Sequence, residues 1–421
     1  MSKKSLVVYR ERLGSFEEVG KIEPMSDGLT FAYSESYLNG PAPHAISHSL
    51  PLVARPFSSE EARPFFEGIL PEGSMRRSLN TMFHASSADT CSLIERLNNE
   101  SAGALVFKTD GERPEEGRGY RPLEWDMFER FARSPQEIAP QVIERSRLSL
   151  AGAQMKMGVF RDKGSGAWFL PQGAAPSSHI VKACDGSFPG QTINEAICME
   201  TARKLDYEVA PCELIAVEGC EPLIAVERFD RVDTGNDYLC RLHQEDFLQA
   251  LPYLRDKYEP TDGNYANHCA SLINDESANP FGDKQFFVLR LMFDWAVGNA
   301  DNHLKNHSLL WSADWGERAL SPLYDVTCTT IYPGIYKEMG VSFGGSRRID
   351  EVTRTEILSM ARSCGTNAKL VGSELDELLE TFPCALRSAV EGICNLGFFR
   401  AEELGRQIEA GFMERRAKID S

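Results

Sequence analysis

The change of hydrophobic period near residue 240 is the feature that most constrains how this chain can fold. Residues 145–232 carry short apolar runs typical of β-strands, interrupted by one helical stretch that begins near Thr192. From His243 onward, apolar side chains instead recur at helical spacing. The predicted helices there span residues 284–297, 352–363, 375–394 and 402–418. A β-rich segment followed by a mostly helical one predicts an α+β protein with two lobes.

The segment before these lobes has signals of its own. Residues 6–9, 19–22 and 29–33 predict strands, and Ser58 or Ser59 followed by acidic residues predicts the first turn of a helix. With 421 residues the chain is long enough for two or three hydrophobic cores. We therefore expect three parts: a β-rich N-terminal subdomain at residues 1–139, an N-lobe at 140–232 and a mostly α-helical C-lobe at 233–421.

Charge and cysteine content exclude several classes of protein. The formal net charge of −17 argues against a free-standing nucleic-acid-binding protein, because such proteins use basic surfaces to displace counterions from phosphates. Any DNA contact would be indirect, through a partner. Eleven cysteines without a Cys-x-x-Cys pair favour reduced thiols and a cytoplasmic location. The longest apolar run, residues 286–297, contains Arg290 and Asp294 and is too short to span a bilayer, so we expect no membrane contact.

A stretch rich in polar side chains follows the helix predicted over residues 284–297. Asp301 and Asn306 are five positions apart, and Asp325 comes after a strand-like segment. Kinase-type phosphoryl transfer uses a carboxylate to orient the attacking hydroxyl and oxygen ligands to hold Mg²⁺, and this spacing suits both needs. The alternative is that these residues only form the helix C-cap and the turn after it. The long preceding helix and the position of Asp325 favour the functional interpretation.

Three earlier segments could complete a phosphate-binding site. Small residues at 149–154 could let backbone N–H groups approach phosphates, although an ordinary turn is the alternative. Lys182 ends an apolar strand, where its ammonium group needs an anion such as Glu195, unless it simply reaches solvent. The run 225–231 could be a hinge that reads adenine, or an edge strand closed by an Arg/Asp pair at the surface.

Together these segments resemble the HipA family of toxin kinases from bacterial type II toxin–antitoxin modules. The resemblance covers nearly the whole chain and is weakest after about residue 345. The motifs that carry it are Ser-Leu-Ala-Gly-Ala-Gln at 149–154, Ser-His-Ile-Val-Lys at 178–182, Ala-Val-Glu-Arg-Phe-Asp-Arg at 225–231, Leu-His-Gln-Glu-Asp at 242–246, Asp-Asn-His-Leu-Lys-Asn at 301–306 and Pro-Leu-Tyr-Asp at 322–325. Two N-terminal segments, 47–52 and 65–71, resemble the first subdomain of the same family.

The resemblance implies a two-lobed, protein-kinase-like fold and an ATP- and Mg²⁺-dependent serine/threonine protein kinase. Asp301 would be the catalytic base, and His303 would stabilise transferred charge or the loop itself. Asn306 and Asp325 would hold Mg²⁺. The ATP site would comprise Lys182 at the phosphates, Glu227 and Phe229 at the adenine hinge, and Ser149, Ala151, Gly152, Ala153, Gln154 and Lys156 in the phosphate loop. Members of the family can silence themselves by phosphorylating a serine in that loop, a position that Ser149 occupies.

By the same resemblance the protein would be a toxin restrained by a helix-turn-helix antitoxin of the HipB type, which would supply the DNA contacts. Its substrate would be a translation component of the aminoacyl-tRNA synthetase type. The chain departs from the family at Met155, where an acidic residue is frequent, and at Asn302, which replaces a frequent glycine. Two other functions stay open. One is a small-molecule phosphotransferase of the aminoglycoside or choline kinase type, and the other is a catalytically silent scaffold or corepressor with a helix-turn-helix partner.

Overall fold

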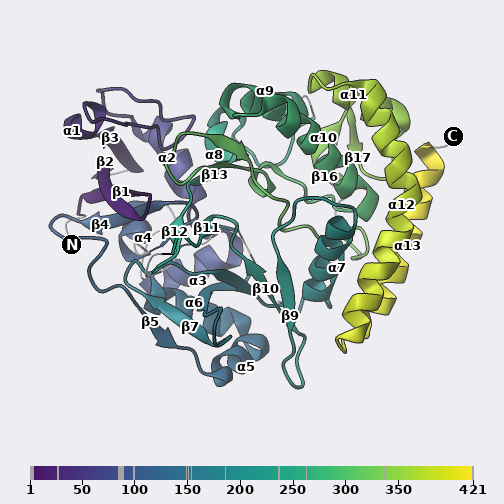
Figure 1. Ribbon diagram of the computed structural model, residues 1–421, viewed down its shortest axis with the longest axis horizontal. Coiled ribbons are helices and arrows are strands. Elements are labelled where there is room, and N and C mark those ends of the chain that lie inside the picture. The colour runs from purple at the N-terminus through teal and green to yellow at the C-terminus, as the bar shows by residue number, and fades with distance from the viewer. Residues whose placement is uncertain are drawn as a thin grey trace.

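The computed structural model separates the β-rich and the helical parts of the chain into opposite sides of the molecule (Figure 1). It describes residues 4–419 apart from 26–27, 84–89, 98–99, 148, 150, 153, 185, 236–237, 262 and 336. The purple and blue strands lie toward the N-terminus, and the long helices α12 (Ala368–Asn395) and α13 (Arg400–Ile419), green to yellow, form the opposite edge. The two-lobed arrangement predicted from the sequence is confirmed.

The N-terminal subdomain is built on an antiparallel sheet in the order β3-β2-β1-β4, against which α2 and α4 pack. In its core, Phe31 packs against Phe57 and Phe66, with ring centroids 6.1 and 5.5 Å apart. As the capping prediction requires, Ser58 precedes α2 and its N–H donates to the Glu61 carboxylate over 2.8 Å. The elements are β1 Leu6–Arg12, β2 Ser15–Met25, β3 Gly28–Tyr33, α1 Glu35–Leu38, α2 Ser59–Gly68, α3 Gly73–Phe83, α4 Thr90–Arg96 and β4 Leu105–Thr109.

The N-lobe is a six-stranded antiparallel sheet in the order β5-β7-β6-β8-β10-β9. Helix α7 is buried because it packs against the edge of this sheet on one side and against α12 and α13 on the other. The elements are β5 Gly119–Pro122, α5 Trp125–Arg133, α6 Pro135–Ser146, β6 Lys156–Arg161, β7 Trp168–Gln172, β8 His179–Lys182, α7 Gln191–Lys204, β9 Cys212–Ile215 and β10 Leu223–Glu227.

The first boundary that the sequence suggested, at residues 139/140, falls inside α6. Strand β5 lies before that boundary, yet it pairs with β7 of the N-lobe sheet, Gly119 opposite Gln172. Residues 119–146 therefore accompany the N-lobe in space, while the division into three parts stays a prediction.

The C-lobe is mostly helical, and α10 runs through its centre with Phe287, Leu291, Phe293 and Trp295 fully buried. Each helix that periodicity predicted after residue 280 is present. The helices are α8 Phe247–Ala250, η1 Pro252–Leu254, α9 Tyr265–Glu276, α10 Pro280–Val297, η2 Leu304–Asn306, α11 Arg354–Ser363, α12 and α13. Short strands complete the lobe: β11 Arg231–Val232, β12 Cys240–Arg241, β13 Gln244–Asp246, β14 Ser308–Trp311, β15 Arg318–Leu320, β16 Glu338–Phe343 and β17 Ser346–Arg348.

Two further expectations concern the environment of the chain. All eleven cysteines are free thiols, six of them buried, as the absence of paired motifs predicted. No helix within the described residues combines the length and the apolar character that crossing a bilayer requires.

Candidate active site

A cavity of about 410 Å³ is lined by residues of the N-terminal subdomain, the N-lobe and the C-lobe. The residues selected from the sequence converge on it although they come from segments up to about 170 positions apart. Those that line the cavity are Ala151, Gly152, Gln154, Lys156, Lys182, Glu227, Phe229, Asp301, His303, Asn306 and Asp325. Ala153 lies outside the described residues, and Ser149 is not part of the cavity lining.

Two lysines lie side by side on the sheet that forms one wall. Lys156 of β6 is directly opposite Lys182 of β8, and side chains at such paired positions share a face of the sheet. The Lys182 ammonium group lies 2.6 Å from both Glu195 Oε1 on α7 and Asp325 Oδ1. These carboxylates outweigh the burial that disfavours its charge and raise the pKa of Lys182. Lys182 therefore stays cationic, and its side chain is buried rather than directed to solvent.

Lys156 has no such partner. Its ammonium group donates to the Ala151 carbonyl over 2.5 Å, and among the described residues it forms no ion pair. Burial lowers the pKa of Lys156 to about 8, against the opposing attraction of Asp325. The loop curls closely over this ammonium group. A Cβ on Gly152 would lie 2.7 Å from it, and the φ of +99° at this position favours glycine.

Ser149 lies behind the loop rather than in the cavity. Its side chain is buried, its Oγ donates to the Ile69 carbonyl over 2.5 Å and its N–H donates to the Glu100 carbonyl over 2.7 Å. These bonds attach the start of the phosphate loop to the N-terminal subdomain. A phosphate on this oxygen could not occupy the same place without breaking the bond to Ile69.

The catalytic loop begins where α10 ends at Gly298, whose φ of +87° closes the helix. The Asp301 side chain is half exposed at the mouth of the cavity. The Asn306 amide nitrogen donates to the Asp301 carbonyl over 2.7 Å, which leaves the side-chain oxygen of Asn306 as the atom that can bind a cation. The turn that the alternative interpretation proposed is real, but it also brings Asp301 and Asn306 together at the cavity.

His303 is held between the loop and the cavity. Its Nε2 lies 3.9 Å from Asp301 Oδ1, too far for a hydrogen bond. Burial lowers the pKa of His303, with the nearby Asp301 charge acting in the opposite direction, so the ring is neutral at neutral pH.

Strand β16 packs tightly on the same loop. The Asn302 side-chain oxygen accepts hydrogen bonds from the N–H groups of Gly340 and Val341, at 2.9 and 3.3 Å. A Cβ on Gly340 would lie 2.5 Å from the His303 Cα, so the approach requires glycine. Asn302, which departs from the family pattern, thus anchors the catalytic loop to β16.

The hinge segment closes the inner end of the cavity. The Glu227 N–H donates to Pro211 O over 2.8 Å and the Arg228 N–H to Ser178 O over 2.9 Å. Within the described residues the Phe229 N–H donates to no acceptor, and it is therefore the first amide after β10 that a ligand could bind. The Phe229 ring packs against Tyr324, with centroids 5.1 Å apart and ring planes tilted by 34°, and the two rings form an apolar surface in the cavity.

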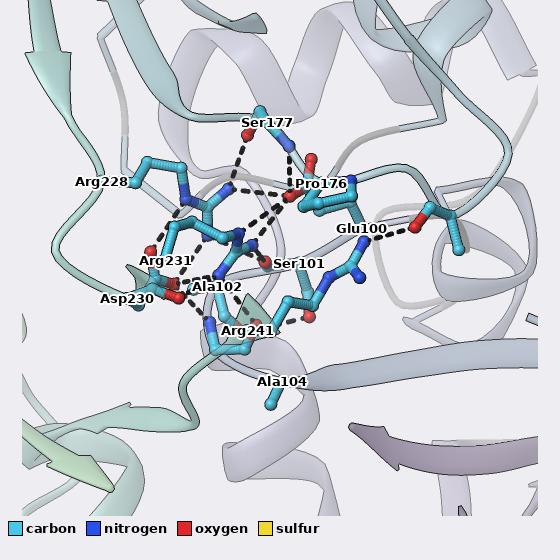
Figure 2. A network of polar contacts seen from close by, with 12 residues as sticks. Glu100, Ser101, Ala102, Ala104, Pro176, Ser177, Arg228, Asp230, Arg231 and Arg241 are labelled. Carbon is cyan, nitrogen blue, oxygen red and sulfur yellow. Dashed lines mark hydrogen bonds and ion pairs between the residues drawn. The ribbon is translucent and has the colours of Figure 1, made fainter. Parts of the chain in front are cut away.

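The Arg/Asp pair beside the hinge is buried, so the surface pair of the alternative interpretation is wrong. Figure 2 shows Arg228, Asp230 and Arg231 interlocked with Glu100 of the N-terminal subdomain. Arg228 Nη2 lies 2.7 Å from Asp230 Oδ2, and Arg231 Nη2 lies 2.8 Å from Glu100 Oε1. The network forms because the hinge is enclosed by the loop that precedes β4, which places these charges out of reach of water.

A second set of charges, which no sequence pattern indicated, lies at the cavity mouth. Glu72, next to the start of α3, forms ion pairs with Lys305 at 3.0 Å and Lys257 at 3.3 Å. Despite its burial, these two ammonium groups lower the pKa of Glu72 to about 2. Its N–H also donates to the Gly152 carbonyl over 3.1 Å, so one residue links the phosphate loop to the catalytic loop. No local pattern marks Glu72, because its partners are distant in sequence.

The donor set fits Mg²⁺ only when a ligand completes it. Asn306 and Asp325 offer oxygen atoms, which Mg²⁺ prefers. Among the described residues no three His, Cys, Asp or Glu side chains gather as a preformed metal site. Phosphate oxygens and water would have to supply the other ligands, as is usual for Mg²⁺ bound with a nucleotide.

Comparison with known proteins places this geometry in a family. A family model described as the HipA-like C-terminal domain matches residues 148–386, and one described as the HipA N-terminal domain matches residues 13–108. The protein "Putative kinase Y4mE" of Sinorhizobium fredii is 34% identical over 375 residues, which cover 87% of this chain and 88% of that protein. The serine/threonine-protein kinase toxin HipA of Shewanella oneidensis is 25% identical over 388 residues, covering 88% and 87% of the two chains.

A solved structure shares the fold over nearly its whole length. HipA in the complex of Shewanella oneidensis HipA, HipB and operator DNA superposes with a TM-score of 0.79 at 23% identity, covering 98% of each chain. A kinase-like fold, both family domains and a full-length relative above 30% identity point the same way. The chain belongs to the HipA family of kinases.

Proposed function

We propose that this chain is an ATP- and Mg²⁺-dependent serine/threonine protein kinase that acts as the toxin of a type II toxin–antitoxin module. The observation that carries the proposal is one cavity with two complementary walls. One wall presents Lys156 and Lys182, and the other presents Asp301, Asn306 and Asp325. Cations for phosphates, oxygen ligands for a metal and a carboxylate at the mouth are the groups that phosphoryl transfer needs.

ATP would lie with its base at the hinge and its phosphates toward the lysines. The Phe229 N–H can donate to a ring nitrogen of adenine, and the Phe229–Tyr324 surface can pack against the base. Lys182 and Lys156 would contact phosphate oxygens under the loop that contains Gly152. The Asp325 carboxylate, which accepts a hydrogen bond from Lys182, would also bind the metal, so the two cations would share this carboxylate.

Asp301 would act on the acceptor hydroxyl. Its half-exposed carboxylate lies where a protein side chain can reach from outside. The hydroxyl proton would pass to Asp301 as the oxygen bonds to the γ-phosphorus and the bond to the leaving ADP breaks. Asn306 and Asp325 would hold Mg²⁺, whose charge offsets that of the phosphates. His303, neutral and buried beside Asp301, would shape the loop rather than carry charge.

Regulation and partners follow from the family as proposals. The relative in the solved complex assembles with HipB and operator DNA. With a net charge of −17 this chain suits an indirect role at DNA, and we infer a HipB-like helix-turn-helix antitoxin as its partner. A translation component is the proposed substrate. Ser149 is the proposed autophosphorylation site, and its modification would release the phosphate loop from Ile69.

Transfer of radiolabelled γ-phosphate from ATP tests the proposal. Purified protein should label itself or proteins of a cell lysate, and Asp301→Asn should lose at least about 10²-fold of this activity because the acceptor proton has no base. Asp275→Asn, an exposed change of the same chemistry at the end of α9, is the control and should retain full activity. Mass spectrometry of the labelled chain locates Ser149 phosphate.

Three results would contradict the proposal. Wild-type protein that binds ATP but transfers no phosphate would support a silent scaffold. ADP release that depends on a metabolite rather than on protein would support a small-molecule phosphotransferase. Equal labelling by wild type and Asp301→Asn would show that Asp301 is not the catalytic base.

A further inference from the structure

A second residue acts directly on the Asp301 carboxylate. The Tyr258 hydroxyl donates to Asp301 Oδ1 over 2.5 Å. Tyr258 belongs to the loop between η1 and α9, 43 positions before Asp301, and does not line the cavity itself. Hydrogen bonds from a hydroxyl to a carboxylate are among the stronger ones in proteins, and this one lies at the group that would accept the substrate proton.

The backbone on both sides of Tyr258 is fixed to the catalytic machinery. The Lys257 carbonyl accepts the Leu304 N–H over 3.1 Å, and the Glu259 N–H donates to the Gly340 carbonyl over 2.9 Å. The buried Glu259 carboxylate also accepts the N–H and the hydroxyl of Ser342, at 2.7 and 2.9 Å. Tyr258 is therefore held between the catalytic loop and β16, and its hydroxyl has a defined position.

The Tyr258 ring is held as well. It packs edge-to-face against His303, with centroids 5.2 Å apart. Burial and the neighbouring Asp301 charge raise the pKa of Tyr258, so the hydroxyl keeps its proton and serves as the donor. Tyr258 is still 41% exposed as a residue, so burial alone does not explain its fixed orientation.

Without this bond the Asp301 carboxylate would be poorly restrained. Its side chain is half exposed, and His303 Nε2 is 3.9 Å away, beyond hydrogen-bonding distance. Within the described residues Tyr258 makes the one hydrogen bond to the Asp301 carboxylate that the structure contains. The bond occupies Oδ1 and leaves Oδ2 for the acceptor hydroxyl.

We propose that Tyr258 is a positioning residue that fixes the Asp301 carboxylate so that Oδ2 faces the incoming hydroxyl. This role rests on the proposed kinase function. Orientation matters because the acceptor proton must move to Oδ2 while the new O–P bond forms and the bond to ADP breaks. A carboxylate that rotates freely in water would adopt this orientation for only part of the time.

Steady-state kinetics of Tyr258→Phe test the role, because the ring and its contact with His303 remain. We expect kcat to fall about ten- to a hundredfold while the KM for ATP and the melting temperature stay at the wild-type values. The control is Tyr253→Phe, which removes the hydroxyl of an exposed tyrosine in η1 that hydrogen-bonds to His268. It should leave kcat unchanged.

A double-mutant cycle separates positioning from general support. In an Asp301→Asn background, Tyr258→Phe should change the residual rate by less than about twofold, because the group through which it acts is gone. A Tyr258→Phe enzyme with wild-type or higher kcat would overturn the role, since the hydroxyl would then make no contribution to the action of Asp301. Absence of transfer by the wild type would instead overturn the proposed kinase function, and the positioning role with it.

Discussion

The network around Glu100 and the lysine pair at the cavity hold the same kinds of charge, two acids and two bases each, but differ in how fully the protein pairs them. In the network, Arg228 and Arg231 meet Glu100 and Asp230 within 3.5 Å (Figure 2). Backbone groups add to this, since the Gly103 N–H donates to Asp230 over 2.8 Å. The arginines lower the pKa of Asp230 despite its burial, so all four charges persist.

At the cavity the pairing is incomplete. Lys182 pairs with both carboxylates, Glu195 and Asp325, whereas within the described residues the Lys156 ammonium group bonds only to one backbone carbonyl. A buried ammonium group without a counter-ion is costly, and its pKa falls accordingly. This difference in pairing indicates that a ligand binds at the cavity and not at the network. The network is complete without one, whereas the Lys156 ammonium group at the cavity has no carboxylate within ion-pair distance among the described residues and could bind an anion from outside.

The comparison predicts that breaking the network damages the fold more than the chemistry. Glu100→Gln keeps the shape of the side chain but leaves the two buried arginines to share the single carboxylate of Asp230. We expect a loss of about 3–5 kcal/mol in the free energy of unfolding, the usual result of leaving one buried charge unpaired. Denaturant titration measures it. Activity per folded molecule should be unchanged, since Glu100 does not line the cavity.

A surface pair supplies the matched control for Glu100→Gln. Glu351→Gln breaks the exposed pair of Glu351 with Arg348, 3.0 Å apart, and should cost about 0–1 kcal/mol. Equal losses for the two variants would show that the Glu100 network contributes no more than an ordinary surface pair.

The opposite result is expected at the cavity. Lys182→Met removes the cation that would contact phosphates, and we expect phosphate transfer to fall about 10²- to 10³-fold. The stability change should be smaller than for Glu100→Gln, because Asp325 is 40% exposed and water can solvate it, while burial raises the pKa of Glu195 and favours its uptake of a proton. Lys204→Met, at the exposed end of α7, is the control with full activity. A stability loss as large as that of Glu100→Gln would erase the distinction between the two regions.

Sequence patterns predicted what is local or periodic in this molecule. The helical repeat after residue 280 and the capping residues Ser58 and Glu61 specify their elements through neighbours within one turn. The spacing of Asp301 and Asn306 likewise fixes a loop in which one side chain bonds the other's backbone. Interactions between residues close together in the chain can therefore be predicted from the sequence.

Contacts between distant segments that no motif marks were not predicted. Glu72, Lys257 and Lys305 meet only after the N-terminal subdomain docks on the C-lobe. Tyr258 reaches Asp301 from another loop, and a lone tyrosine has no spacing to mark it. The Arg/Asp pair of the hinge was assigned to the surface because nothing local reveals that the loop around Glu100 covers it.

The smallest expected effect concerns Lys156 and pH. Its pKa of about 8 in the folded chain, against 10.5 for an ordinary lysine, means that the side chain loses its charge as pH rises through 8. Between these values the unfolded chain binds the extra proton, so this group makes stability rise with pH.

The affinity for ATP should instead fall as pH rises, and we expect the Kd for ATP to increase about five- to tenfold between about pH 7 and about pH 9. Lys182 stays charged across this range because its pKa is raised, so the change isolates Lys156. Calorimetric titration of ATP measures this Kd. The Lys156→Arg variant, whose guanidinium group does not titrate in this range, should give a nearly constant Kd. A wild-type Kd that also stays constant over the same range would show that Lys156 already has a counter-charge in solution.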